Sequence, residues 1–304
     1  MPAEVAIKPS TSHFVDIRGE RHHVQTWGEP QWPQLVLLHG WMDVGASFQF
    51  LVDALARDWY VIAPDLRGFG RSAWQAQGYW FHDYFADLEA LLAHFVGDAP
   101  ARLVGHSLGG NIVMGYAGVR PDRVQRVVSL EGFGIPAEPP DVAPRKIAAW
   151  LDGIANPPSF KTYANLGAVA DRLQTKNPRL PRDKAEFLAA HWAASFPDER
   201  AELVSDPRHK LRFPHVYRMD EIFAIWRRIS APVLWIAAED SEIPRWLVNH
   251  PEGEAGADGL DEVRRRIAHV PGARLETIAD AGHMLHHDQP EKVAALIEPF
   301  LAAG

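Results

Sequence analysis

Short, uninterrupted apolar runs alternate along the chain with longer stretches in which apolar residues recur every three or four positions. The clearest apolar runs are residues 35–38, 61–63, 103–104, 127–128 and 233–236. A continuous apolar run suits a strand that is covered on both faces of a sheet. Apolar spacing of three and four predicts core-facing helices over residues 81–95 and 293–300. This alternation predicts a doubly wound, mostly parallel sheet of the α/β class.

The two ends of the chain carry local signals of their own. Residues 13–17 and 22–27 flank a polar Arg-Gly-Glu-Arg segment, which predicts an N-terminal β-hairpin. Near the other end, Asp288 stands where a helix N-cap belongs and Pro290 falls in the first turn that follows. A last helix is therefore expected to begin directly after Asp288.

The alternation of strands and helices is interrupted once. From residue 134 the chain is too rich in proline for a regular element, and about 85 residues of helix-prone sequence follow, including 184–194 and 219–228. The strand pattern resumes only after Pro232. We therefore expect a helical cap over residues 136–228, inserted into an α/β core of residues 1–135 and 229–304.

Composition and charge indicate which binding partners and which cellular compartment to expect. The 304 residues have a formal net charge of −8 and one dense basic run, 264–266, which follows two acidic residues and is interpreted as a solvated helix face. No nucleic-acid partner is expected. The chain has no cysteine, which excludes disulfides, a thiol nucleophile and a thiolate metal site. Without a signal-peptide pattern or a long apolar span, we expect no membrane association and a cytoplasmic location.

The segment 105–109, Gly-His-Ser-Leu-Gly, carries the strongest chemical signal. A serine with a glycine two positions away on each side, at the end of an apolar run, is typical of a sharp strand-to-helix turn that exposes a nucleophile. Glycine at the flanking positions avoids collisions that side chains would make. Ser107 is therefore the candidate nucleophile, and it needs a base held in one tautomer by a buried carboxylate.

Among fifteen histidines, His283 is the best placed base. It directly follows a predicted strand at 274–278 and precedes the last helix. His286 and His287 lie a step further along the same loop, where they should face elsewhere.

The predicted acid is Asp240, just past the apolar run 233–236 and close to Glu239 and Glu242. A second candidate is Glu131, which ends the strand that begins at residue 127, because the acid can also occupy that strand end in this architecture. Ser107, Asp240 and His283 follow the order nucleophile, acid, base.

Acyl transfer also requires two N–H donors for the developing oxyanion. The backbone N–H of Leu108 is one candidate, because it lies at the start of a helix whose dipole adds positive potential. The N–H of Trp41, in the loop after residues 35–38, is the other. His39 is interpreted as a structural histidine that holds this loop. The segment 65–72 is interpreted as a structural loop, because no P-loop lysine follows its glycines.

Together these motifs resemble the α/β-hydrolase superfamily over nearly the whole chain, although Ala237 stands where that family has a glycine. The cap segments 159–163, 177–180 and 205–211 are similar to the serine hydrolase-like proteins. The resemblance implies a Ser–His–acid hydrolase with poorly defined natural substrates. A serine nucleophile excludes the dehalogenases and epoxide hydrolases of this fold, which use aspartate at the same turn.

We therefore expect an esterase for small to medium, mainly apolar substrates, without metal or organic cofactor. The expected substrate pocket consists of His106, Phe133, Trp150, Trp192 and Trp226. Carbon–carbon bond hydrolysis, cofactor-free perhydrolysis and a non-catalytic ligand-binding role stay open, because the triad alone does not separate them. A small-molecule substrate is the expected partner, and a homodimer stays open.

Overall fold

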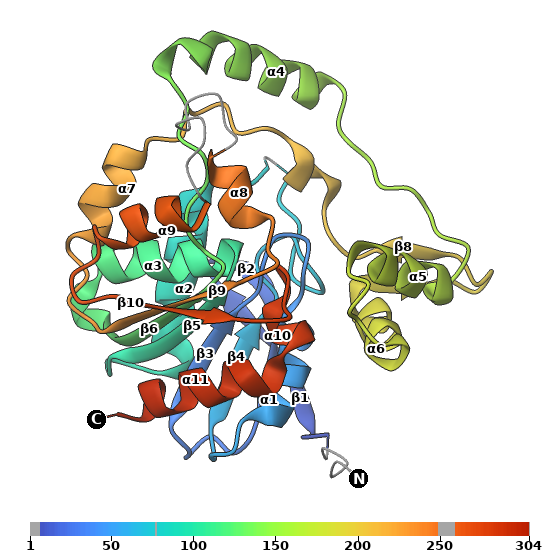
Figure 1. Cartoon of the computed structure of the whole chain (residues 1–304). Coiled ribbons are helices and arrows are strands. Elements are labelled where there is room, and N and C mark those ends of the chain that lie inside the picture. Colours follow the sequence, from blue (N-terminus) through green and yellow to red (C-terminus); the bar gives the residue numbers. More distant parts are fainter. Residues whose placement is uncertain (1–6, 77, 249–258, 304) are drawn as a thin grey trace.

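The computed structural model describes residues 7–76, 78–248 and 259–303 and has one large sheet at its centre (Figure 1). The strand order is β1-β2-β4-β3-β5-β6-β9-β10. β1 and β2 run antiparallel to their neighbours, and the other strand pairs are parallel. The strands are β1 (Ser10–Ile17), β2 (Glu20–Trp27), β3 (Gln34–Leu38), β4 (Tyr60–Pro64), β5 (Ala101–His106), β6 (Val124–Leu130), β9 (Val233–Ala238) and β10 (Arg274–Ile278). The α/β class and its mostly parallel sheet are confirmed.

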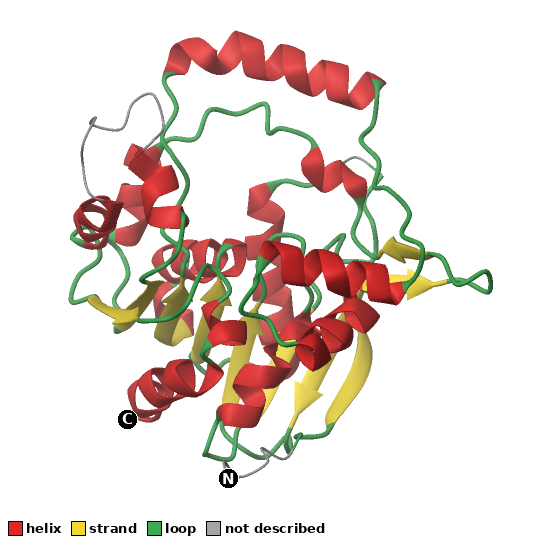
Figure 2. Cartoon of the chain, turned by 45° about the vertical axis from the view of Figure 1, so that its right-hand side comes forward, coloured by secondary structure: helices red, strands yellow, loops and turns green. Residues whose placement is uncertain are grey.

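Helices cover both faces of the sheet, which explains why its strands are apolar throughout (Figure 2). In β3, Val36 and Leu38 belong to the core on one face, whereas Leu35 and Leu37 belong to the core on the other. The first face is covered by α2 (Phe81–Phe95), α3 (Leu108–Val119), α7 (Met219–Trp226) and α9 (Gly259–Ile267), with α8 (Ile243–Val248) against α9. The second is covered by α1 (Gln49–Ala54), α10 (Leu285–Asp288) and α11 (Pro290–Ala302).

The local predictions at the chain ends have different outcomes. The hairpin is confirmed, since Ile17 of β1 pairs with Glu20 of β2. The last helix is confirmed as α11, but its N-cap is Gln289 rather than Asp288. The carboxylate of Asp288 instead accepts from the backbone N–H of Gly282 at 2.9 Å, so it fixes the loop before α10.

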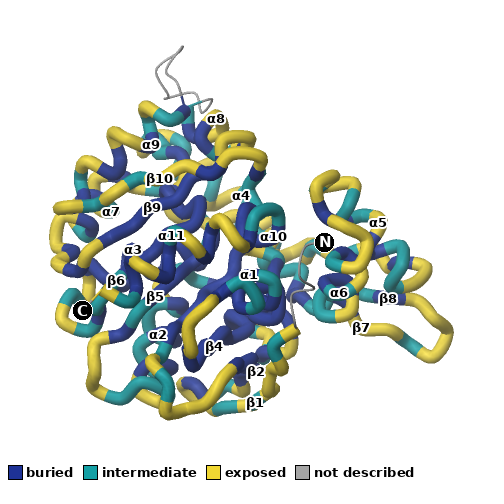
Figure 3. Tube along the Cα trace, turned by 60° about the horizontal axis from the view of Figure 1, so that its bottom comes forward, coloured by how far each residue is buried: buried dark blue, intermediate teal, exposed yellow. Residues whose placement is uncertain are grey.

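The segment between β6 and β9 contains two separate parts. α5 (Leu166–Lys176), α6 (Arg182–Trp192), β7 (Ala193–Ser195) and β8 (Ala201–Leu203) share a small core of their own and lie to one side of the sheet (Figure 3). We call residues 163–203 the lid unit. α4 (Ala143–Ala155) spans the top of the molecule and has no buried residue. α7, by contrast, packs on α3, where Ile225 lies against Gly118, and Phe223 and Trp226 of α7 belong to the core of that face. The part that stands away from the sheet therefore ends before α7 rather than at residue 228.

Polar contacts join the lid unit to the core. Arg179 Nη2 lies 2.5 Å from Asp240 Oδ2, and Asn177 Nδ2 donates to Asp288 Oδ1 at 2.6 Å. Trp192 Nε1 donates to Asp43 Oδ1 at 2.9 Å. The Arg179–Asp240 pair is exposed and contributes little to stability. Met42 and Phe50 of the core also pack against the apolar cluster of the lid unit.

The chain that follows the lid unit packs against the segment 65–72 and against Tyr79. The ring of His209 lies between Phe69 and Tyr79, with ring centroids 3.8 Å and 3.6 Å away. Tyr79 also donates its hydroxyl to Asp206 at 2.8 Å. Asp65 accepts from the N–H groups of Gly45 and Arg71, which confirms the interpretation of 65–72 as a structural loop.

The basic run at 264–266 is only partly solvated. Arg264 and Arg265 are exposed on α9, but Arg266 is buried and donates to the carbonyls of Phe133 and Ile135. The interpretation of the run as a solvated face was wrong for Arg266, because its guanidinium satisfies carbonyls of the chain leaving β6. No helix in the described ranges is long and apolar enough to cross a membrane.

Two buried histidines predict a loss of stability in acid. Burial lowers the pKa of His39 and of His209 from 6.5 to about 4. The unfolded chain therefore binds these protons first, and stability present above pH 6.5 is lost as the pH falls towards 4. Each such proton contributes a slope of about 1.4 kcal/mol per pH unit. Asp43, whose pKa burial raises to about 7, has the opposite sign and offsets one of the two.

Urea denaturation between pH 7 and 4.5 is expected to give a falling free energy of unfolding, and His209→Gln is expected to flatten that slope. His94→Gln, at an exposed position on α2, is the matched control. A free energy of unfolding that is constant or rises on acidification would contradict the assignment of these histidines as neutral.

Candidate active site

Ser107 occupies a strained turn between β5 and α3. Its φ and ψ are 52° and −110°, in the left-handed half of the map that non-glycine residues rarely adopt. A Cβ on Gly105 would overlap the Gly109 carbonyl, and one on Gly109 would overlap the Leu38 carbonyl. The flanking glycines are therefore required for the close approach of strand and helix. The turn leaves the Ser107 side chain partly exposed at the carboxyl end of the sheet.

The ring of His283 bridges Ser107 and a buried carboxylate. Its Nε2 lies 3.0 Å from Ser107 Oγ, and its Nδ1 lies 3.3 Å from Glu131 Oε2. Glu131 follows β6 directly and is 2% exposed. Its other oxygen accepts from the Ala238 N–H at 2.7 Å, and Ser241 Oγ also donates to the carboxylate. Two donors at the end of β9 thus hold this carboxylate against His283.

The expectation that Asp240 holds His283 was wrong in its geometry. The Asp240 side chain is 50% exposed and pairs with Arg179 of the lid unit. Its backbone N–H donates to the Ala281 carbonyl at 3.0 Å, which orients the residue away from the interior. Glu131, the second candidate, takes the place beside Nδ1 because the end of β6 lies between β5 and β9 in the sheet.

The loop after β3 lies against the nucleophile. A Cβ on Gly40 would come within 3.3 Å of Ser107 Cβ, so the backbone here passes directly beside Ser107. Trp41 follows in this loop, and Leu108 begins α3. Both line one pocket of about 80 Å³. Leu66 donates its N–H to His39 Nε2 at 2.9 Å, and His39 Nδ1 donates to the Gly40 carbonyl at 2.7 Å, which confirms His39 as a structural histidine.

The five expected pocket residues separate into two groups. Trp150 of α4 lines the pocket that contains Trp41 and Leu108. Trp192 lines a second cleft, of about 320 Å³, together with His283. Phe133 and Trp226 were wrongly assigned to the pocket, because both are buried against Trp235 in the core.

His106 is also buried rather than exposed to a pocket. Its Nε2 donates to the His283 carbonyl at 2.8 Å, so it supports the backbone of the catalytic loop from behind. It therefore contacts His283 and lines neither of the two clefts beside it.

The two clefts differ in chemistry. The smaller is largely aromatic, with Tyr79, Trp80, Phe81, Tyr84 and Phe213 in addition to the two tryptophans. The larger lies between the lid unit and the core and contains Arg172, Lys176 and Arg179 opposite Asp240 and Glu242. Arg179, Arg172 and Lys176 were not expected at the site, and helical periodicity alone offers no signal for them.

Comparison with known proteins identifies the class that this fold and site define. A family model for the α/β hydrolase fold matches residues 33–290, and the chain belongs to this family. It is 40% identical over 295 residues to Lipase LipV of Mycobacterium tuberculosis, covering 92% of this chain and 97% of that protein. It is 27% identical over 285 residues to a serine hydrolase-like protein of Danio rerio, covering 91% and 84%. These matches confirm both resemblances expected from the motifs.

A solved structure shares the architecture. The thioesterase domain from the curacin biosynthetic pathway superposes with a TM-score of 0.80 at 22% identity, covering 95% of this chain and 99% of that domain. At this identity the likeness establishes the fold alone. The chain is thus a hydrolase of this family, with esterase and lipase relatives.

Proposed function

We propose that the chain is a serine hydrolase that cleaves carboxylic esters through an acyl-enzyme on Ser107. One observation carries this proposal: His283 lies within hydrogen-bond distance of Ser107 Oγ on one side and of the buried Glu131 carboxylate on the other. Nucleophile, base and acid in contact, with the base held by the acid, form the arrangement that activates a serine hydroxyl. The lipase among the similar proteins supports the same class of reaction.

In the proposed reaction His283 Nε2 removes the proton of Ser107 as its Oγ attacks the ester carbonyl. Glu131 accepts the Nδ1–H of His283, which fixes the tautomer and stabilises the imidazolium. The N–H groups of Leu108 and Trp41 stabilise the oxyanion. His283 then protonates the departing alcohol, and a water molecule activated by the same base releases the acid from Ser107.

The substrate is proposed to place its apolar part in the aromatic pocket. That pocket shares Trp41 and Leu108 with the proposed oxyanion site, so an acyl or alkoxy chain leaving the reacting carbon meets aromatic surface. Trp150 of α4 and Trp80 line the same pocket, with ring centroids 6.5 Å apart. Apolar surface removed from water contributes about 25 cal/mol per Å², so longer chains should gain affinity until the pocket is filled.

A panel of nitrophenyl esters of rising acyl length tests this proposal. We expect kcat/KM to rise with chain length, and Trp150→Ala to lower it for the longer esters by about tenfold while leaving the acetate ester within about twofold. Trp246→Ala, at an exposed tryptophan on α8, is the matched control. Highest activity on charged acyl groups would contradict the apolar pocket.

The same panel includes a vinylogous diketone and peroxide with halide. Turnover of either of these without turnover of any ester would overturn the proposed ester hydrolysis while leaving the serine machinery in place.

A further inference from the structure

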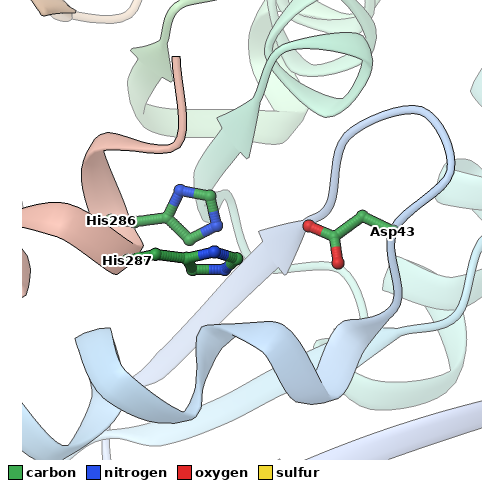
Figure 4. Close-up of side chains that lie close together, drawn as sticks. All are labelled: Asp43, His286 and His287. Atoms are coloured by element: carbon green, nitrogen blue, oxygen red, sulfur yellow. The ribbon is translucent and has the colours of Figure 1, made fainter. Parts of the chain in front are cut away.

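Three side chains that the proposed reaction does not use lie together behind the catalytic loop. Asp43 lies in the loop after β3, and His286 and His287 lie on α10. All three are buried, and one ligand atom from each lies within 4.8 Å of the others. Figure 4 shows the Asp43 carboxylate directed toward the two imidazoles. The loop and the helix that carry them also flank Ser107 and His283.

Polar atoms on all three side chains have no hydrogen-bond partner among the described residues. They are Asp43 Oδ2, His287 Nε2 and both ring nitrogens of His286. The remaining oxygen of Asp43 is satisfied, since Oδ1 accepts from the Val44 N–H at 2.8 Å and from Trp192 Nε1 at 2.9 Å. Buried polar atoms in folded proteins nearly always have a partner, so this group requires one.

The three side chains offer ligand atoms to one small buried space. A deprotonated carboxyl oxygen and a neutral imidazole nitrogen each provide a lone pair to a metal ion. Asp43 must lose its proton to bind such an ion.

We propose that Asp43, His286 and His287 bind one divalent transition-metal ion. Two imidazoles and a carboxylate are a ligand set that suits Zn²⁺ and its first-row neighbours, with further positions left for water. Such an ion would tie the loop after β3 to α10. His287 also lines the cleft between lid unit and core, which provides a path for entry.

One nearby positive charge opposes metal binding, so removing it should raise the affinity for the metal. Lys184 of the lid unit donates from its ammonium to the His287 carbonyl at 3.1 Å. Its positive charge disfavours a cation at the site. Lys184→Met is therefore expected to strengthen metal binding, whereas a change at any of the three ligands weakens it.

Calorimetric titration of chelator-treated protein with Zn²⁺ tests the site. We expect one tight site in the wild type and a loss of affinity of about tenfold or more in Asp43→Asn and in His287→Gln. Asparagine keeps the two contacts of Oδ1 and replaces only the unpartnered oxygen. His94→Gln, at an exposed histidine, should bind as the wild type does.

Zinc-soaked crystals of the wild type decide the question even if a variant fails to fold. An anomalous peak between the three side chains would support the proposal. Equal Zn²⁺ affinity and stoichiometry in wild type and Asp43→Asn, or anomalous peaks only elsewhere, would overturn it. These readouts do not depend on ester hydrolysis. The metal site can therefore be rejected without rejecting the proposed reaction, and the reverse also holds.

Discussion

Ser107→Ala is expected to lower ester hydrolysis by about 10⁶-fold and to abolish labelling by a fluorophosphonate probe. In the proposed reaction the hydroxyl oxygen of Ser107 forms the acyl-enzyme, and no cysteine is present that could replace it. Alanine removes only Oγ, so the turn and its backbone N–H groups should be unchanged. Rates come from a nitrophenyl ester assay, and labelling from mass spectrometry of the modified peptide.

Ser195→Ala is the control for this experiment, because Ser195 is an exposed serine of the lid unit. It should be labelled at Ser107 as fast as the wild type. Equal labelling of wild type and Ser107→Ala would contradict the assignment of the nucleophile. It would also favour a ligand-binding role on a hydrolase scaffold.

Glu131→Gln is expected to lower kcat by about 10³- to 10⁴-fold, whereas Asp240→Asn should change it by less than about threefold. Glutamine keeps the volume of the buried side chain but has no charge to stabilise the imidazolium of His283. Asp240 is half exposed and pairs with Arg179, so its loss removes only a solvent-screened ion pair. The measurement is the steady-state rate on one ester for both variants, with melting temperatures to show that both are folded.

Comparing the activity of the two variants tests which carboxylate acts on His283 more directly than either rate alone. If Asp240→Asn lost activity as severely as Glu131→Gln, the lid unit would have to move and release Asp240 from Arg179 during turnover. Full activity of Glu131→Gln would contradict the role of Glu131 at His283.

The residues at the strand ends show which parts of the candidate site could be predicted from the sequence. Ser107 and His283 could be predicted because each follows an apolar run and carries a local signal, the flanking glycines in one case and the position before the last helix in the other. The sequence pattern favoured Asp240 over Glu131, although each is a carboxylate at the end of an apolar run. Which of them meets His283 depends on strand order and on where each loop turns, and neither property is local.

The aromatic residues show the same limit. Phe133, Trp150 and Trp226 are equally apolar in sequence, but only Trp150 lines a pocket, because it lies on a helix that has no other layer above it. The other two follow or precede strands whose neighbours cover them. Hydrophobicity predicts that such a residue avoids water, but it does not say whether protein or substrate covers it.

The sequence by itself determined the α/β architecture, the turn at Ser107, the histidine that lies beside Ser107 and the interruption after β6. These features follow from periodicity and from backbone restrictions that act over a few residues. Only the tertiary structure decided that Glu131 lies beside His283, that Asp240 pairs with the lid unit, and that Asp43 lies near His286 and His287. Such pairings join residues 61 or more positions apart. They depend on how strands are ordered and loops are packed rather than on the residues beside them.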